Sequence, residues 1–271
     1  MKPGNLLMTS QDPGVFEQSA NDEFSNPAPV KQLKSRTIYK SRRIAGSLGR
    51  PGIVQISDFD ASSRTESDKL NTGPVGPEIF RAPEVMLDAG YTYPADIWSL
   101  GVTVRLIQDS YGAKLTLQVF YLLENKDLFD PGRHGFDEYD EGPHLGQITA
   151  LLGPPPQDLL DKGDRTSKFY ESGDSTKDSD GTTENEKKST TDDQKKDKRA
   201  VRYTGQLKDP GWVPTDFDFD SSVTCMEGDE KGKFIRFIKR MLKWDPDERA
   251  TASELLRDPW LNQHDSGDSG D

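Results

Sequence analysis

The amino-acid sequence predicts a mainly α-helical fold with a few short β-strands. Apolar residues recur at helical spacing in residues 94–102 and 233–242, which predicts two helices that each bury one face. Residues 146–152 are also expected to be helical, because they end at Gly153, which is followed by three prolines. One alternating, β-branched run at residues 52–57 predicts a strand.

Shorter elements and loops are expected in the rest of the chain. Residues 9–50 are polar, with scattered proline, glycine and serine, and this composition predicts loop with short extended pieces. Residues 81–87 are expected to open a short helix. A last helix is expected near residues 251–256, after the turn that begins at Trp244.

Residues 171–200 form a long tract without core-forming side chains. They contain one hydrophobic residue, Ala200, together with nine acidic and seven basic residues. Such a segment cannot bury enough apolar surface to offset the entropy lost on ordering, so its composition predicts disorder. A solvated insertion is the favoured interpretation, and a basic docking arm is the alternative.

Charge and cysteine content exclude several functional classes. The 271-residue chain has a net charge of -12, which argues against general binding to nucleic acid or anionic membranes. Cys225 is the only cysteine, so an internal disulfide and a multi-cysteine zinc site are excluded. No apolar run approaches the ~20 residues that a membrane helix needs. We therefore expect a protein of the cytoplasm or nucleus with no membrane partner.

Five short motifs follow one another in an order that chance does not produce. The five are Lys2-Pro3-Gly4-Asn5-Leu6-Leu7, Asp58-Phe59-Asp60, Ala82-Pro83-Glu84, Asp96-Ile97-Trp98-Ser99-Leu100-Gly101 and Met241-Leu242-Lys243-Trp244-Asp245-Pro246-Asp247-Glu248-Arg249. Asp-Phe-Asp alone and Ala-Pro-Glu alone are weak, but the run from Pro94 to Gly101 shortly after Ala-Pro-Glu is strong. Trp-Asp-Pro-x-x-Arg and the closing Asp258-Pro259-Trp260-Leu261 make the set close to decisive. Together these motifs resemble the signature set of eukaryotic protein kinases.

The resemblance implies the carboxy-terminal lobe of a kinase, a helical bundle with a few short strands, with the amino-terminal lobe absent. The glycine-rich loop, the strand lysine and the helix-C glutamate of that lobe are not found, and the catalytic aspartate would precede Met1. This chain alone is therefore expected to be inactive. The expected segments are 1–170 (first part of the lobe), 171–200 (charged insertion), 201–262 (last helices) and 263–271 (disordered tail).

The resemblance also implies roles for individual residues in a site that uses ATP and Mg²⁺. Lys2 matches the lysine that contacts the transferred phosphate, and Asn5 and Asp58 match the two metal ligands. Glu84 and Arg249 match a buried structural ion pair.

Asp96 matches the structural aspartate that opens the central buried helix. Two departures put activity in doubt, because Asp60 replaces a hinge glycine and Pro77 replaces a threonine that contacts the catalytic aspartate.

Within the kinases, residues 147–155 and the insertion that contains residues 36–39 resemble the CMGC group, in particular the fungal SR-protein-kinase-like serine/threonine kinases. This implies protein substrates of the Arg/Ser-rich kind and no direct nucleic-acid partner. The oligomeric state is not predicted. The alternative function is a pseudokinase-like module that binds protein partners without catalysis.

Residues 104–118 interrupt the kinase pattern. The central helix begins normally and its expected ending resumes at Val119, but the 15 residues from Val104 to Gln118 match nothing in the family. A block of that length inside a packed helix would shift buried side chains by about 22 Å, so it must loop out or the lobe must misfold. A retained intron is the favoured interpretation, and a natural surface excursion is the alternative.

The remaining conspicuous residues are expected to be unremarkable. Asp218-Phe219-Asp220, a second Asp-Phe-Asp, is interpreted as an acidic loop. The three histidines are interpreted as surface residues of polar loops, and the hydroxyl residues between Asp58 and Glu84 as solvated loop residues, with phosphorylation sites as the alternative. These histidines and hydroxyl residues are His134, His144, His264, Ser62, Ser63, Thr65, Ser67 and Thr72.

Overall fold

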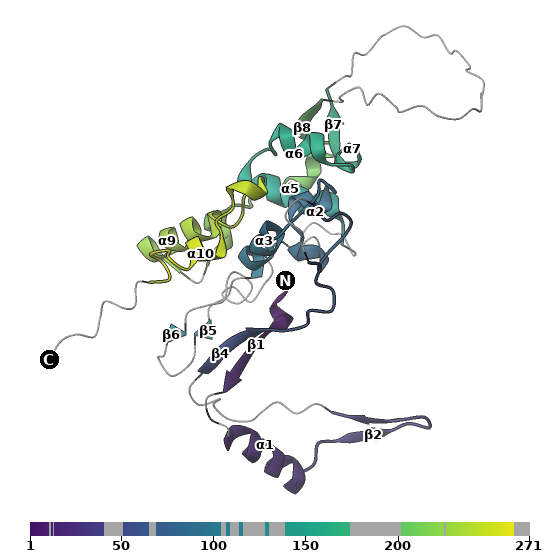
Figure 1. The fold of residues 1–271 in the computed structure, drawn as a ribbon, viewed down its shortest axis with the longest axis vertical. Coiled ribbons are helices and arrows are strands. Elements are labelled where there is room, and N and C mark those ends of the chain that lie inside the picture. Colours follow the sequence, from purple (N-terminus) through teal and green to yellow (C-terminus); the bar gives the residue numbers. More distant parts are fainter. Residues whose placement is uncertain are drawn as a thin grey trace, which may run out of the picture. The chain divides into compact units, whose positions relative to one another are not determined.

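The structure is a computed structural model, and it describes residues 1–10, 12, 14–40, 51–64, 69–103, 107–108, 114–115, 128–129, 139–173, 202–224 and 226–262 (Figure 1). Its helices are α1 Gly14–Ser25, α2 Pro83–Met86, α3 Pro94–Thr103, α5 Glu141–Leu152, α6 Gln157–Lys162, α7 Thr166–Phe169, α8 Phe219–Ser222, α9 Gly228–Lys239 and α10 Ala252–Leu255. Its strands are β1 Leu6–Ser10, β2 Val30–Gln32, β3 Thr37–Tyr39, β4 Pro51–Ile56, β5 Ile107–Gln108, β6 Lys114–Leu115, β7 Tyr170–Ser172 and β8 Tyr203–Leu207.

Helices predominate, and the strands form four separate two-stranded ribbons among the described residues. Short 3-10 turns η1 Pro3–Asn5, η2 Glu78–Phe80, η4 Pro210–Trp212 and η5 Pro246–Glu248 connect some of these elements. The mainly helical composition predicted from the sequence is therefore correct. Every helix in the described part of the chain is too short or too polar to cross a membrane.

The described chain divides into two compact units, one of residues 3–60 and one of residues 1–2 and 61–271. In the smaller unit, β1 pairs antiparallel with β4, with Leu6 opposite Ile56, and β2 pairs antiparallel with β3. Helix α1 lies where the sequence predicted only loop and short strands, and that prediction was wrong. The Asp12 carboxylate accepts a hydrogen bond from the Gly14 N–H at 2.8 Å and satisfies a donor at the start of the helix.

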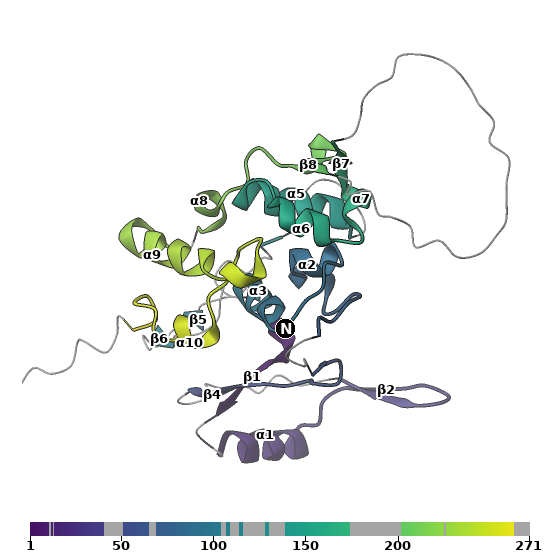
Figure 2. The ribbon, with the colours of Figure 1, turned by 45° about the horizontal axis from the view of Figure 1, so that its top comes forward.

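The core of the larger unit surrounds Trp98 on α3. The side chain of Trp98 is fully buried, and its ring stacks on Phe129 with 6.1 Å between ring centroids. Phe129 also contacts Phe217, with 6.4 Å between ring centroids. Helices α5, α6 and α7 and the β7–β8 ribbon make one side of this unit, and Figure 2 shows the ribbon beside α6 and α7.

Helix α3 ends at Thr103, immediately before the block of residues 104–118 that departs from the kinase pattern. Within this block β5 and β6 form a short antiparallel ladder, with Ile107 opposite Leu115, while Phe129 further along the chain returns to the core. The block therefore leaves the helix instead of extending it. Its other residues, and the rest of the predicted helix ending up to residue 127, lie outside the described residues.

Two further elements differ from the sequence prediction because polar caps were overlooked. Helix α5 begins at Glu141, five residues before the predicted start, because the Asp140 carboxylate accepts the Gly142 N–H at 3.0 Å. Asp218 caps α8 in a reciprocal capping box, and Phe219 is only 5% exposed. The second Asp-Phe-Asp is therefore a helix start with a buried anchor, and the prediction of an acidic loop was wrong.

Close packing between α5 and η4 depends on a glycine. A Cβ atom on Gly146 would lie 2.0 Å from the carbonyl oxygen of Trp212, a backbone atom that cannot rotate away. Gly142, one turn earlier, would bring a Cβ to 2.7 Å from the Trp212 ring. The absence of side chains at both positions lets α5 approach this turn closely.

We predict that Gly146→Ala lowers the free energy of unfolding by about 1–3 kcal/mol, because the added methyl group overpacks the contact with Trp212. Gly232→Ala on α9 is the matched control, since its Cβ would meet only the flexible end of Arg236 at 3.5 Å. The control should be neutral or slightly stabilising through helix propensity. Urea denaturation of both variants measures the difference, and equal stabilities would contradict the packing argument.

Candidate functional site

Asn5 and Asp58, the two metal-ligand candidates, are brought together at one end of the β1–β4 ribbon. Asn5 directly precedes β1, and Ser57 follows the end of β4. The Ser57 N–H donates to the Asn5 carbonyl oxygen at 2.8 Å, and the Ser57 hydroxyl donates to the same oxygen at 3.1 Å. Antiparallel pairing thus places Asn5 opposite the residue next to Asp58, although 53 positions separate the two in sequence.

Asp58 has an unusual backbone conformation. Its φ angle of 64° lies in the left-handed region, which few residues other than glycine adopt and which aspartate tolerates better than most. Such conformations concentrate at functional sites, because the surrounding structure must hold them in place. Here the β1–β4 pairing holds the residue just before Asp58.

The chemistry of the pair suits a hard cation. A carboxylate and a side-chain amide supply oxygen atoms, which Mg²⁺ prefers over nitrogen or sulfur. No group of three or more His, Cys, Asp or Glu side chains in the described part of the chain is arranged to hold a metal. Asn5 and Asp58 alone could therefore hold Mg²⁺ only together with water or phosphate oxygens, which is the usual coordination of Mg²⁺ in nucleotide sites.

Two other residues of the kinase pattern, Lys2 of the first motif and Asp96 of the fourth, belong to the larger unit. Asp96 lies in the first turn of α3, where its negative charge is attracted to the positive end of the helix dipole and stabilises the helix. The Met1 ammonium group lies 3.5 Å from Asp96 Oδ1. Lys2 is therefore not part of the unit that contains Asn5 and Asp58.

Glu84 and Arg249 meet as a buried bidentate ion pair. Arg249 Nη1 and Nη2 donate to Glu84 Oε1 and Oε2, both at 2.6 Å, and the two side chains are 0% and 1% exposed respectively. Two parallel charge-assisted hydrogen bonds are the strongest arrangement that a guanidinium and a carboxylate can form. The pair joins α2 to the turn after η5 across 165 positions of sequence.

The remaining donors of Arg249 are also satisfied. Its Nε atom donates to the Lys243 carbonyl oxygen at 3.0 Å, and Nη1 donates to the Pro94 carbonyl oxygen at 2.9 Å. The guanidinium carbon lies 5.2 Å from the centroid of the Trp98 ring, within the range of a cation–π contact. A single side chain therefore links α2, the first residue of α3, the core tryptophan and the chain after α9.

Arg81, which precedes the Ala-Pro-Glu motif, fixes the segment that leads into α2. Its Nε atom donates to the Gly76 carbonyl oxygen at 3.2 Å, and Gly76 has a positive φ of 68° that favours glycine. A cavity of about 180 Å³ lies beside this segment, and residues of the segment and of α3 line it. Val75, Tyr93 and Ser99 are among them.

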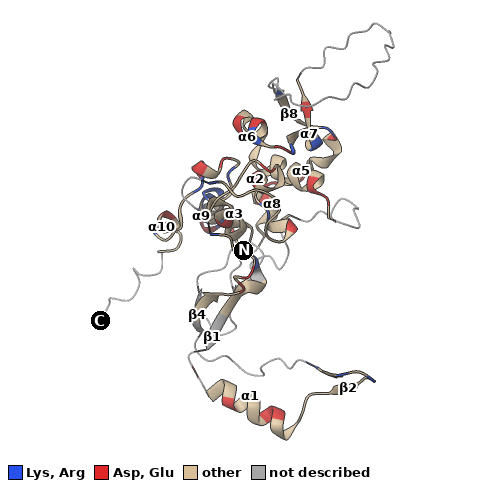
Figure 3. Cartoon of the chain, turned by 45° about the vertical axis from the view of Figure 1, so that its right-hand side comes forward, with Lys and Arg blue, Asp and Glu red and all other residues tan. Residues whose placement is uncertain are grey.

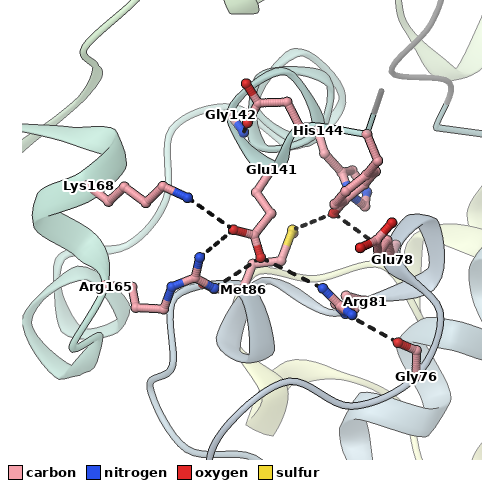
Figure 4. Close-up of polar contacts among 11 residues, drawn as sticks. Gly76, Glu78, Arg81, Met86, Glu141, Gly142, His144, Arg165 and Lys168 are labelled. Atoms are coloured by element: carbon pink, nitrogen blue, oxygen red, sulfur yellow. Dashed lines mark hydrogen bonds and ion pairs between the residues drawn. The ribbon is translucent and has the colours of Figure 1, made fainter. Parts of the chain in front are cut away.

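Three cationic side chains converge on the carboxylate of Glu141 at the start of α5 (Figure 4). Arg165 donates from both of its terminal nitrogens, Lys168 Nζ lies 3.5 Å from Oε2, and Arg81 Nη1 lies 3.8 Å from Oε1. Burial by itself would raise the pKa of Glu141, but the hydrogen bonds and positive charges of Arg165 and Lys168 outweigh it and lower the pKa. Glu141 thereby connects the segment before α2 to α5 and α7.

His144 is fully buried, and the prediction that it is a surface residue was wrong. Its Nδ1 atom lies 3.0 Å from the Tyr139 hydroxyl, and its ring packs on Phe129 with 4.7 Å between centroids. The Tyr139 hydroxyl also donates to the Glu78 carbonyl oxygen at 3.2 Å. Burial and, to a smaller extent, the charge of Arg81 lower the pKa of His144 to about 3, so the ring is neutral at physiological pH.

Burial also raises the pKa of Tyr139, and the negative charge of Glu141 adds to this effect. The sequence alone indicated no roles for Tyr139, Glu141 and Arg165, because Tyr139 bonds Glu78 across 61 positions and Glu141 bonds Arg165 across 24. One available signal was the position of His144 at apolar spacing ahead of the predicted helix at 146–152. His134, His264, Thr65 and Ser67 lie outside the described residues.

Comparisons with known proteins are consistent with the kinase pattern. Residues 44–110 match the protein kinase domain. The chain is 31% identical over 252 residues to a serine/threonine protein kinase of Aspergillus fumigatus, covering 92% of this chain and 51% of that protein. It is 31% identical over 212 residues to the human dual specificity tyrosine-phosphorylation-regulated kinase 3, covering 78% and 30% respectively.

A third relative is the serine/threonine-protein kinase SRPK of Physarum polycephalum. The two are 28% identical over 278 residues, covering 96% of this chain and 54% of that protein. This chain therefore carries a protein-kinase-domain segment, and its relatives include serine/threonine protein kinases. It spans about half the length of the first of the curated relatives it matches.

We predict that removing one partner of the buried ion pair strongly destabilises the larger unit. Glu84→Gln or Arg249→Met should each lower the free energy of unfolding by about 3–5 kcal/mol, because each strands a buried group. The double variant should lose less unfolding free energy than the sum of the losses in the two single variants. Chemical denaturation measures all three.

The exposed pair Asp229–Lys233 on α9 provides the matched control for this prediction. The Asp229 side chain is 77% exposed, so Asp229→Ala should change the denaturation midpoint little. If the losses of unfolding free energy in the two single variants add up in the double variant, Glu84 and Arg249 are not coupled. A loss no larger than that of the control would also contradict the prediction.

We predict that the buried His144 makes stability fall as pH falls. Its folded pKa of about 3 lies below the unfolded value of 6.5, so between these values the unfolded chain binds more protons than the folded one. As the pH falls below 6.5, the loss of unfolding free energy from this group approaches about 1.4 kcal/mol per pH unit. The His144→Asn variant should lose this pH dependence of stability, even if the variant is less stable than the wild-type chain at pH 7.

Urea denaturation at several pH values between 5.5 and 7 measures the slopes. This window lies above the range in which Glu141 titrates, because the lowered pKa of Glu141 lies below 4.5. Parallel slopes in the wild-type chain and in His144→Asn would show that another group carries the pH dependence.

Proposed function

We propose that this chain supplies the metal-binding and substrate-binding part of a serine/threonine protein kinase of the SR-protein-kinase-like kind, in which ATP phosphorylates protein substrates. One observation carries the proposal. Asn5 and Asp58, which match the two metal ligands of the kinase pattern, lie at the same end of one ribbon, because Asn5 pairs with the residue next to Asp58. The buried pair Glu84–Arg249 supports it, because the same pattern assigns those two residues to each other.

In this proposal the residues of the chain act mainly by positioning and by electrostatics, which is what phosphoryl transfer requires of a protein. Mg²⁺, when bound, neutralises charge on the phosphates. Asn5 and Asp58 would hold the metal through oxygen atoms, and the left-handed backbone of Asp58 would fix the direction of its carboxylate. The kinase pattern assigns Lys2, in the other unit, a separate role, which is contact with the transferred phosphate.

The substrate proposed is a basic protein segment of the Arg/Ser-rich kind. A net charge of -12 favours encounter with positively charged partners over anionic ones. The cavity of about 180 Å³ beside Gly76 gives a side chain of such a segment a place to enter. Asp96 and Tyr93 are among its lining residues, and a cationic side chain would compete with the Met1 ammonium group for the Asp96 carboxylate.

A second candidate is a protein-binding lobe without catalysis, and two residues favour it. Asp60 occupies the position of the hinge glycine in Asp-Phe-Gly, and Pro77 occupies the position of a threonine that contacts the catalytic aspartate. The glycine-rich loop and the strand lysine that cover ATP are not found in residues 1–271. We therefore expect this chain to bind the metal ion and the protein substrate. By itself it is expected to transfer no phosphate.

Metal binding tests the first candidate directly. Mn²⁺ in the presence of ATP should bind the 271-residue chain, as measured by water proton relaxation or by loss of the free Mn²⁺ electron-spin signal. Asn5→Ala and Asp58→Ala should each weaken this binding by about tenfold or more, because each removes one oxygen ligand. Asp220→Ala is the matched control, since it changes the last residue of the other Asp-Phe-Asp motif.

A second assay separates the two candidates. Incubation with ATP, Mg²⁺ and an Arg/Ser-rich peptide should show saturable peptide binding under both candidates. Phosphate incorporation that is lost in Asp58→Ala would establish an enzyme and refute the expectation that the chain alone is inactive. Peptide binding without Mn²⁺ binding would support the non-catalytic lobe, and the absence of both would overturn both candidates.

A further inference from the structure

A strongly basic segment lies within this acidic protein. Residues 27–50 contain seven lysine and arginine residues and no aspartate or glutamate, although the whole chain carries a net charge of -12. Strands β2 and β3 lie in this segment, and Figure 3 colours basic residues of their ribbon blue and acidic residues of α1 red. Four of the seven, Lys31, Lys34, Arg36 and Lys40, are exposed residues of the described chain and make a surface that attracts anions.

The β2–β3 ribbon has two open edges. The two strands pair only with each other in the described part of the chain. The Leu33 N–H donates to the Arg36 carbonyl oxygen at 2.8 Å, and the Lys40 N–H donates to the Pro29 carbonyl oxygen at 3.0 Å. In an antiparallel ladder every second residue turns its N–H and C=O outward, so Thr37 and Tyr39 present theirs at the free edge of β3.

One face of the ribbon combines positive charge with an apolar side chain. Lys31 lies opposite Ile38, and because side chains alternate along a strand, Arg36 and Lys40 share the face of Ile38. All four residues are exposed, and Ile38 retains 42% of its accessible surface. The free edge of β3 therefore presents the order basic, apolar, basic at every second position.

We propose that the free edge of β3 binds an extended acidic peptide, which adds a third strand to the ribbon. The outward N–H and C=O groups of Thr37 and Tyr39 would pair with the peptide backbone, as in other cases where a strand is added to an open edge. Side chains of paired strands interact with those directly opposite, so the peptide needs an acidic residue opposite Arg36 and another opposite Lys40. Its sequence pattern is acidic–x–apolar–x–acidic.

Two features favour a peptide over a nucleic acid as the partner. One is the open edge of β3, and the other is the negative charge on the neighbouring helix α1. A strand edge offers alternating donors and acceptors that match another polypeptide backbone, whereas a polyphosphate uses only donors and positive charge. Helix α1 of the same unit carries Glu17, Asp22 and Glu23, which repel a long polyanion. The site is independent of the proposed kinase function, whose substrate is basic.

Fluorescence anisotropy with two labelled peptides of identical composition tests the pattern. The full 271-residue chain should bind a peptide containing Glu-Thr-Val-Thr-Glu, with affinity that falls as salt is added. It should bind one containing Thr-Glu-Val-Glu-Thr at least about tenfold more weakly, because its acidic side chains lie on the opposite face from valine. Equal binding of both peptides would overturn the proposal, since it would reflect net charge alone.

Two variant pairs locate the site. Arg36→Glu/Lys40→Glu should weaken binding of the first peptide at least about tenfold, and Lys69→Glu/Lys162→Glu, with the same change of net charge, should not.

Tyr39→Pro removes an outward N–H from the β3 edge without breaking the ladder and should also weaken binding. Val30→Pro does the same on the β2 edge and should leave binding unchanged. Equal effects of the two proline variants would overturn the assignment to β3.

Two anionic competitors complete the test. A twelve-nucleotide single-stranded RNA and vesicles containing phosphatidylserine should compete weakly with the peptide at physiological salt. If either binds more tightly than the peptide and loses affinity in Arg36→Glu/Lys40→Glu, the basic ribbon serves a different class of partner and the proposal is wrong. None of these variants touches Asn5 or Asp58, so loss of Mn²⁺ binding and loss of peptide binding can be distinguished.

Discussion

The Arg249 guanidinium group lies where three segments distant in sequence converge. It binds Glu84 of α2 through two hydrogen bonds, the carbonyl oxygen of Pro94 at the start of α3, and the carbonyl oxygen of Lys243 after α9. A side chain that is 0% exposed can remain charged only because every donor has an acceptor. This arrangement fixes the beginning of α3, and with it the core around Trp98.

The packing around α3 follows from this anchoring. A Cβ atom on Gly101 would lie 2.9 Å from the Leu242 side chain and 3.0 Å from that of Met241, so α3 and the end of the α9 region are in direct contact. Phe129 stacks on the Trp98 ring, and His144 packs on Phe129. The buried face of α3 extends to its last turn, where Gly101, Val102 and Thr103 are all buried.

The sequence was most informative where local rules decide the structure, and least where distant partners do. The strand ending at Ile56 and the helix starting at Pro94 could be predicted from side-chain alternation and from proline at a first turn. The pairing of Asn5 with the Asp58 region depends on strand register, for which only the family resemblance gave a clue. The spacing of His144 hinted at its burial, but the ion pairs of Glu141 could not be predicted, because they depend on Arg81 and Arg165 and no local rule places those partners.

The β7–β8 ribbon has a practical consequence for handling this protein. Tyr170 pairs with Leu207, Ser172 pairs with Tyr203, and the Gly173 N–H donates to the Arg202 carbonyl oxygen at 2.6 Å, so residues 173 and 202 lie next to each other. The entropy of closing a loop grows only with the logarithm of its length. The polypeptide joining these two points can therefore be shortened, lengthened or replaced by a reporter domain at small cost to the helices that the ribbon adjoins.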